Sequence, residues 1–166
     1  ILGSGCNAAW FGTFQMNTTE AAGIGTDINN LRAAGGDVIV SFGGAAAPEL
    51  ADVCTSVASL QAQYQAVVTK YALKYVDFDI EDFNPTAIDI RNQALTMISG
   101  APIHYTLGVL QSGMTSAQTS VLSNAKSHNV NVSMVNIMAM DYGGAVGEMY
   151  SAAISATTSS GRRRRR

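Results

Sequence analysis

The stretch Tyr75–Asp82, with the sequence YVDFDIED, alternates acidic and large apolar side chains. Successive side chains of a β-strand point to opposite faces, so Asp77, Asp79 and Glu81 would share one face of a strand and the apolar residues the other. Carboxylates are rarely buried unless they are paired. Three of them on one face of an apolar strand therefore indicate a chemical site.

The segments on both sides of this strand switch between strand-like and helix-like patterns. Short apolar runs predict strands, and apolar residues at helical spacing predict helices. The predicted strands are 37–44, 75–81, 103–110 and 132–142. The predicted helices are 19–36, 48–72, 85–100, 115–129 and 148–160. Glycines interrupt the first of these helices, Gly100 closes the third, Thr115 caps the fourth, and residues 1–5 look like the end of a further strand.

This alternation of strands and helices is typical of an α/β protein with a parallel sheet. The chain has 166 residues, of which 47% are hydrophobic and 13% charged, as expected of one globular domain. We assign residues 1–160 to this domain and residues 161–166, which include five arginines, to a flexible or vector-derived tail. Arginine runs can bind nucleic acid, but no basic residues elsewhere extend this one into a surface, so no nucleic-acid partner is expected. No membrane partner is expected either, because no apolar run reaches about 18 residues.

The two cysteines, Cys6 and Cys54, leave the redox state of the protein open. They could form one disulfide in a secreted protein, or they could be two separate thiols. The low share of charged residues and the many Ser, Thr, Asn and Gly residues favour a secreted protein.

The acids of the strand 75–81 allow three interpretations. They could be ordinary solvated side chains, but a parallel strand covered by helices has no solvated face. They could bind a divalent metal, although Phe78, Ile80 and Asp82 do not fit an EF-hand loop. They could be the acid and base of a hydrolase, because like charges this close cannot all ionise cheaply, and at least one carboxyl should keep a proton near neutral pH. The hydrolase interpretation is favoured.

Several motifs resemble those of the chitinases of glycoside hydrolase family 18. The family signature on the fourth barrel strand, Asp-Gly-x-Asp-x-Asp-x-Glu, is similar to KYVDFDIE at residues 74–81, where the last three acids match and Lys and Tyr replace the first Asp and Gly. SFGG at residues 41–44 resembles the Ser-x-Gly-Gly of the third strand. MDY at residues 140–142 resembles the Met-x-Tyr of the sixth strand, and HYTLGVL at residues 104–110 is similar to the fifth strand of bacterial members.

The resemblance implies a (β/α)8 barrel of the TIM type, of which this chain holds roughly strands two to six. A complete barrel takes about 250 residues, so the catalytic domain would be a partial one. A partial barrel has unpaired sheet edges and an exposed interior face. We therefore expect the chain alone to be much less active than a full-length enzyme, or to work after self-association through these edges.

The resemblance also implies a function, the hydrolysis of β-1,4-linked N-acetylglucosamine in chitin or chito-oligosaccharides, with no metal and no cofactor. The retaining mechanism would use the acetamide of the sugar as the nucleophile. Glu81 would protonate the glycosidic oxygen and then activate water, Asp79 would hold the acetamide N–H, and Asp77 would share a proton with Asp79. Tyr142 would donate its hydroxyl to the acetamide carbonyl, and Ser41 would hydrogen-bond to Asp77.

Ser41 and four other residues are candidates for contact with the substrate. Met140 and Asp141 belong to the MDY motif, and Gly44 ends the SFGG motif. Trp10, the one tryptophan of the chain, could stack on a sugar ring or be a packing residue. The resemblance leaves the details of these contacts open.

The acid series also predicts which carboxyl keeps its proton. Asp77 lies deepest along the strand, where burial should most favour the protonated form, and Glu81 lies nearest the loops.

Two alternative functions are a non-catalytic glycan-binding lectin of the same fold and an endo-β-N-acetylglucosaminidase. Lectin-like members commonly lack the catalytic glutamate, so the presence of Glu81 favours an enzyme.

Overall fold

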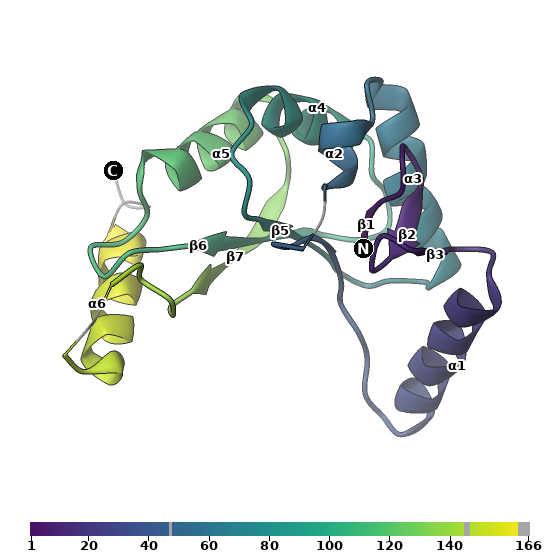
Figure 1. Ribbon diagram of the computed structural model, residues 1–166, viewed down its shortest axis with the longest axis horizontal. Helices are drawn as coiled ribbons and strands as arrows, with labels where there is room; N and C mark the ends of the chain where they lie inside the picture. Colours follow the sequence, from purple (N-terminus) through teal and green to yellow (C-terminus); the bar gives the residue numbers. More distant parts are fainter. Residues whose placement is uncertain (47, 145–146, 163–166) are drawn as a thin grey trace.

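A four-stranded parallel sheet forms the centre of the protein, as Figure 1 shows. The computed structural model describes residues 1–46, 48–144 and 147–162. The strands, in spatial order, are β4 (Val40–Gly43), β5 (Val76–Ile80), β6 (Ile103–Gly108) and β7 (Val132–Met138). The predicted α/β class with a parallel sheet is confirmed. The described residues do not close this sheet into a barrel, so the eight-stranded barrel stays a prediction.

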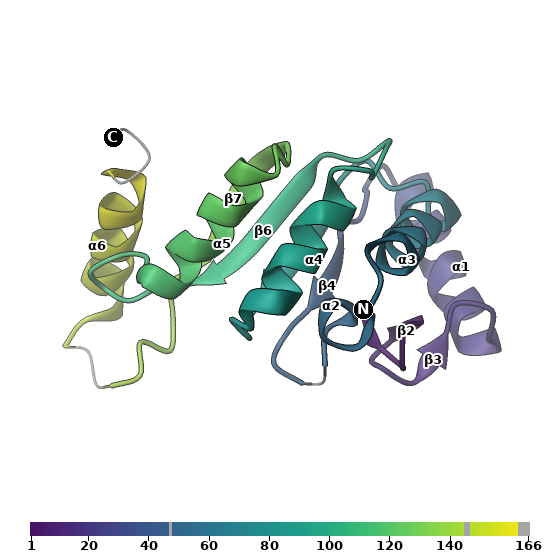
Figure 2. The same cartoon turned by 90° about the horizontal axis from the view of Figure 1, so that it is seen from above.

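Three helices cover one face of the sheet. They lie side by side in Figure 2 and are α3 (Val57–Lys70), α4 (Pro85–Leu95) and α5 (Ser116–Ser127). The other helices are α1 (Thr19–Ala33), α2 (Leu50–Val53) and α6 (Met149–Arg162). Among the helices that the structure describes, none has the length and apolar character needed to cross a membrane. The predicted arginine tail starts within α6, and residues 163–166 lie outside the described residues.

Aromatic side chains fill the interface between the sheet and these helices. Phe42 of β4 and Phe78 of β5 stack with their ring centroids 5.3 Å apart. Tyr64 of α3 contacts both rings edge-on, at 4.8 and 4.9 Å between centroids. Because Phe78 lies between Asp77 and Asp79 in the sequence, its burial among these rings turns both carboxylates to the opposite face of β5.

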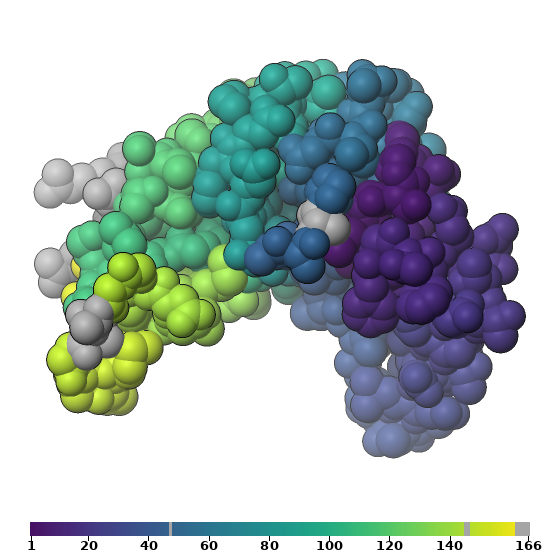
Figure 3. Space-filling view, viewed as in Figure 1, coloured from purple at the N-terminus to yellow at the C-terminus, as the bar shows by residue number. Residues whose placement is uncertain are grey.

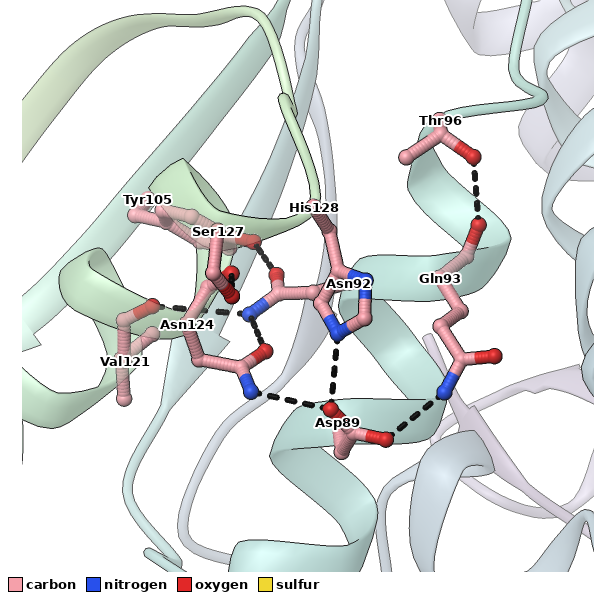
Figure 4. A network of polar contacts seen from close by, with 9 residues as sticks. All are labelled: Asp89, Asn92, Gln93, Thr96, Tyr105, Val121, Asn124, Ser127 and His128. Atoms are coloured by element: carbon pink, nitrogen blue, oxygen red, sulfur yellow. Dashed lines mark hydrogen bonds and ion pairs between the residues drawn. The ribbon is translucent and has the colours of Figure 1, made fainter.

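A polar network ties α4 to α5 and to the strand beneath them (Figure 4). Asp89 of α4 accepts a hydrogen bond from Asn124 at 2.9 Å and contacts Nε2 of His128 at 2.7 Å. Asn92 donates to Asn124 at 2.7 Å and accepts from the hydroxyl of Tyr105 in β6. The bonds from Asn124 and His128 lower the pKa of Asp89. The network therefore fixes the helix layer on the sheet through satisfied polar groups.

The predicted helix 48–72 is wrong in one respect, because it consists of two helices. Cys54 has an extended backbone and ends α2, and Ser56 begins α3 by accepting a hydrogen bond from the N–H of Ser59. Cys54 also forms a disulfide with Cys6, which settles the pairing that the sequence leaves open.

Other elements differ from their predicted bounds. Helix α4 ends at Leu95, and Gly100, the predicted end, lies in a later turn with φ of 89°. Helix α1 is continuous through its glycines, although the sequence predicts an interruption. The predicted cap of α5 at Thr115 is confirmed, whereas β7 ends at Met138, four residues before the predicted end.

The first 15 residues form a small antiparallel sheet that the sequence does not predict. Its strands are β1 (Leu2–Gly3), β2 (Ala8–Trp10) and β3 (Phe14–Gln15). The expected strand end near residues 1–5 is confirmed, because the N–H of Gly43 donates to the carbonyl of Ile1 at 2.9 Å beside β4. Figure 3 shows this N-terminal segment, in purple, next to the blue segments around β4 and α2.

Candidate active site

Strand β5 carries its acids on one face, as the alternation predicts. Val76, Phe78 and Ile80 are buried, whereas Asp77 and Asp79 are half-buried. Glu81 follows the last residue of the strand and is exposed. The face opposite the helix layer therefore presents a row of carboxylates that ends at the carboxyl edge of the sheet.

Asp79 and Glu81 line a hollow of about 490 Å³ at this edge of the sheet. Its walls also include Gly43 and Gly44 from the end of β4, Asp52 from α2, and Asp82 from the loop after β5. Catalytic and binding sites of parallel α/β folds lie at the carboxyl ends of the strands. The predicted substrate-contacting residue Gly44 is therefore part of the same hollow as two of the three predicted catalytic acids.

The two glycines of SFGG are required by their contact with β5. Gly43 and Gly44 both have a positive φ, 96° and 99°, which residues with a side chain rarely adopt. The N–H of Gly44 donates to the carbonyl oxygen of Asp79 at 3.0 Å. A Cβ on Gly44 would lie 3.7 Å from Oδ2 of Asp79. The motif thus bends the end of β4 around Asp79 and leaves its carboxyl open to the hollow.

Asp79, the middle acid of this row, has a raised proton affinity. Burial raises its pKa to about 6, and the neighbouring charges of Glu81 and Asp77 act in the same direction. Its Oδ1 atom is buried and has no hydrogen-bond partner among the described residues. The sequence places the most strongly protonated carboxyl at Asp77, at the start of the strand. In the structure, burial and neighbouring charges combine at Asp79, the middle acid.

Asp77 is held by two hydroxyl groups, one on each carboxylate oxygen. Ser41 of β4 donates to Oδ2 at 2.6 Å, which confirms the predicted hydrogen bond. Thr106 of β6 donates to Oδ1 at 2.9 Å, and Nδ2 of Asn136 in β7 donates to Oγ1 of Thr106 at 3.3 Å. Neither Thr106, which lies in HYTLGVL, nor Asn136 is a predicted site residue. Both are polar residues in otherwise apolar strands, and both stand in register with Asp79 of β5. This pattern is the signal from which they could have been predicted.

A second, smaller hollow of about 250 Å³ lies over this hydrogen-bonded row. It is lined by Ser41, Asp77, Thr106, Asn136 and the buried His104. Asp77 therefore faces a different space from Asp79 and Glu81. Because each of its carboxylate oxygens is held by a hydroxyl group, Asp77 is suited to support its neighbour Asp79.

Tyr142 does not line the hollow that Asp79 and Glu81 share, and its place beside the sugar stays a prediction. The chain leaves the extended conformation at Asp141, where φ is 48°, so the alternation of β7 does not continue to Tyr142. Tyr142 packs in a small apolar cluster that also contains Val135 and Ile137. These two residues pair in register with core residues of β6 and so point to the helix side of the sheet. Met140 is exposed, and neither it nor Asp141 lines the hollow.

Trp10 is a packing residue in this structure, not an exposed platform for a sugar. Its indole N–H donates to the hydroxyl of Tyr71 at 2.9 Å, and the two rings meet edge-on at 5.8 Å. It is half-buried against the main core and does not line the hollow. Within the described residues, no group of three or more His, Cys, Asp or Glu side chains is arranged to hold a metal ion.

Comparisons with known proteins identify the relatives of this chain. No protein-family model matches it. A probable bifunctional chitinase/lysozyme of Escherichia coli K12 is 39% identical over 130 residues, which is 72% of this chain and 14% of that protein. Endochitinase 11 of Metarhizium anisopliae is also 39% identical over 130 residues, which is 25% of its length. The chain is a chitinase homologue.

Solved structures agree with this relationship. The catalytic domain of a hyperthermophilic chitinase from Pyrococcus furiosus superposes with a TM-score of 0.80 at 25% identity, over 91% of this chain and 49% of that one. Catalytic-site mutants of a chitinase domain from the same organism, complexed with chito-oligosaccharides, match equally well, with a TM-score of 0.80 and 25% identity over the same shares of both chains. The chitinase homologue thus spans about half of these solved chains and a quarter or less of the two curated relatives. It corresponds to part of a chitinase catalytic domain.

Proposed function

We propose that this chitinase homologue hydrolyses β-1,4-linked N-acetylglucosamine chains by retaining, substrate-assisted acid–base catalysis. The observation that carries the proposal is the hollow that Asp79 and Glu81 share at the carboxyl ends of β4 and β5. The names of the relatives support the substrate class, since they are chitinases. Chitin and chito-oligosaccharides are therefore the proposed substrates.

Glu81 is the proposed general acid and base. It is exposed directly after β5 and lines the hollow, so its carboxyl can reach a glycosidic oxygen bound there. In the first step its proton moves to the leaving oxygen, the glycosidic bond breaks, and the acetamide oxygen of the sugar bonds to the anomeric carbon. In the second step the carboxylate takes a proton from water, whose oxygen replaces the acetamide oxygen at that carbon.

Asp79 is the proposed partner of the acetamide group. Its buried Oδ1 lacks a hydrogen-bond partner among the described residues and could accept the acetamide N–H of a bound sugar. With a pKa raised to about 6, mainly by burial, Asp79 can lose its proton near neutral pH. The resulting carboxylate would stabilise the positive charge that develops on the acetamide-derived ring. Asp77, fixed by Ser41 and Thr106, would support it from below.

The proposed mechanism gives Tyr142 no role, because its side chain packs in the cluster with Val135 and Ile137.

The proposed localisation is extracellular. The disulfide between Cys6 and Cys54 supports it, since disulfides persist in oxidising compartments.

Turnover of a fluorogenic chito-oligosaccharide by the chain and by its Glu81→Gln variant tests the proposed function. The variant keeps the shape of the side chain and removes its proton, so we expect turnover to fall by about 100-fold or more. Glu20→Gln, at an exposed position in the first turn of α1, is the matched control and should leave turnover unchanged. The oligomeric state of the same preparation tests the expected self-association.

A second substrate tests the part played by the acetamide. Oligomers of glucosamine lack the acetyl oxygen that acts as nucleophile, so the chain should not cleave them. Equal turnover by the parent chain and Glu81→Gln would reject the acid–base assignment. Equal turnover of the acetylated and deacetylated oligomers would reject substrate assistance.

A further inference from the structure

A buried ion pair forms part of the wall of the hollow. Arg91 of α4 has no exposed surface, and Glu49, which precedes α2, is 6% exposed. Nε of Arg91 donates to Oε1 of Glu49 at 2.5 Å, and Nη2 donates to Oε2. Glu49 also lines the hollow that contains Asp79 and Glu81. No sequence motif draws attention to this carboxylate, yet it borders the same space as the proposed catalytic acids.

Stability does not explain this pair. Taking two charges out of water costs several kcal/mol per ion, and apolar side chains of similar volume are often as stabilising or more so. Nη1 of Arg91 and the hydroxyl of Tyr64 are also buried, and although Arg91 acts on that hydroxyl, neither atom makes a hydrogen bond of normal geometry among the described residues. A charged pair in such a place is more readily explained by what its charge does in the hollow.

The surroundings of Glu49 show why it needs Arg91. The groups that act on its carboxyl are Arg91 from α4, Asp52 from α2 and Asp82 from the loop after β5. Burial raises the pKa of Glu49, and Arg91 opposes that rise through its charge and its hydrogen bonds. Burial alone would lower the pKa of Arg91, but Glu49 outweighs it and raises that pKa. The two donated bonds match a charged carboxylate, so we take the pair as ionised.

The pair also connects the two loops that build the hollow. Glu49 belongs to the loop between β4 and α2, and Arg91 lies in α4, which follows the loop after β5. Helix α2 packs against α4 at this point. The bidentate geometry therefore ties the loop that follows SFGG to α4, the helix that follows the loop carrying Glu81.

We propose that Glu49 and Arg91 are positioning residues of this site, in which the ion pair fixes the wall of the hollow and presents the carboxylate of Glu49 to the space that Asp79 and Glu81 also line. This inference rests on the proposed function. The charge of Glu49 adds to those of Glu81 and Asp77 that disfavour ionisation of Asp79. It also faces a space in which positive charge develops on the sugar, where a fixed anion lowers the barrier.

The experiment removes both charges together, so that no buried charge is left without its partner. In the variant Glu49→Met/Arg91→Met, the volumes stay similar and we expect a folded protein. We expect kcat on the chito-oligosaccharide to fall by about 10-fold, with KM changed by less than about twofold, because the pair acts on the chemical step. We also expect the carboxyl carbon resonance of Asp79 to titrate at lower pH than in the parent chain, since Glu49 is among the charges that raise the pKa of Asp79 and its partner Arg91 is not among those that lower it.

Arg32→Met is the matched control, because Arg32 forms an ion pair with Asp37 at 2.7 Å whose side chains are about a quarter exposed. It should change neither kcat nor the titration of Asp79. A folded double variant with parental kcat and parental titration would overturn the inference. If this double variant does not fold, Glu49→Gln/Arg91→Gln, which also removes both charges but keeps polar groups at both positions, serves instead, and an unchanged titration of Asp79 in that variant overturns the inference equally.

The two readouts also separate this inference from the proposed function. The titration of Asp79 needs no turnover. A parent chain that binds no chito-oligosaccharide and cleaves none would contradict the proposed function, while the shift of the Asp79 resonance would still decide whether the charge of Glu49 acts on the hollow.

Discussion

A Cβ atom on Gly43 would lie 2.1 Å from the carbonyl oxygen of Asp79. This distance is far below any normal contact, and the oxygen belongs to the backbone, so it cannot swing aside. Strands β4 and β5 therefore approach each other at their carboxyl ends as closely as a glycine allows. The close approach places the loop after β4 against Asp79, and this is how a short motif on one strand shapes the site on the next.

Gly43→Ala should destabilise the protein by at least about 2 kcal/mol, because the new methyl group meets backbone and the residue also has φ of 96°. Urea unfolding followed by circular dichroism measures the effect. The control is Gly23→Ala in α1, where nothing lies within 4 Å of the new Cβ. That change should stabilise the protein by about 0.5–1 kcal/mol. Similar effects of the two substitutions would contradict the close approach.

The raised pKa of Asp79 predicts a pH-dependent cost to stability. Burial, Glu81 and Asp77 raise this pKa from 3.8 to about 6, so between these values the folded state binds more protons than the unfolded state. Stability should therefore decline as pH rises through this window, and the cost should be fully present above pH 6. Because Asp79 is partly exposed, solvent screening reduces the size of the effect.

Asp79→Asn removes this cost, so it should stabilise the protein more at pH 8 than at pH 4. Urea unfolding at both pH values gives the comparison, and Asp27→Asn, at an exposed position of α1, is the control. The prediction fails if the gain from Asp79→Asn is the same at the two pH values. Turnover of the chito-oligosaccharide should fall in this variant at both.

The acid face of β5 could be predicted from the sequence because it depends on a local rule. Alternation along a strand decides which side chains share a face, and Val76, Phe78 and Ile80 are buried as that rule requires. The bond between Ser41 and Asp77 could be anticipated for a similar reason. The two residues stand opposite each other in the register of adjacent parallel strands, and both lie in recognisable motifs.

The rest depends on contacts between distant parts of the chain, which periodicity does not encode. Glu49 and Arg91 are 42 residues apart, and each looks like an ordinary surface charge of a predicted helix. The break at Cys54 follows from a disulfide that the sequence leaves open. The place of Tyr142 beside the sugar rests on the family resemblance and stays a prediction, because the positive φ at Asp141 ends the strand alternation before this residue.

Thr106→Val should lower kcat by about 10-fold with little change in KM. The substitution keeps the shape of the side chain and removes the hydroxyl that donates to Oδ1 of Asp77 at 2.9 Å, so this carboxylate loses one of its two fixed bonds. Steady-state kinetics on the chito-oligosaccharide measure the split between kcat and KM. Thr106→Ser retains the hydroxyl and should keep most of the parental kcat. Equal kcat values for the valine and serine variants would show that the hydroxyl does not matter to the site.

Tyr142→Phe tests where the tyrosine of the MDY motif lies. The hydroxyl of Tyr142 is buried without a hydrogen-bond partner among the described residues, and its ring packs in the cluster with Val135 and Ile137. Removing an unsatisfied buried hydroxyl should stabilise the protein by about 1 kcal/mol, since its desolvation cost is no longer incurred. The free energy of unfolding in urea checks this, with Tyr150→Phe at an exposed position of α6 as the control that should change little.

Because Tyr142 does not line the hollow, kcat of Tyr142→Phe should stay within about twofold of the parent value. A loss of activity as large as that of Glu81→Gln, without a gain in stability, would instead place the hydroxyl of Tyr142 beside the sugar, as the family resemblance implies.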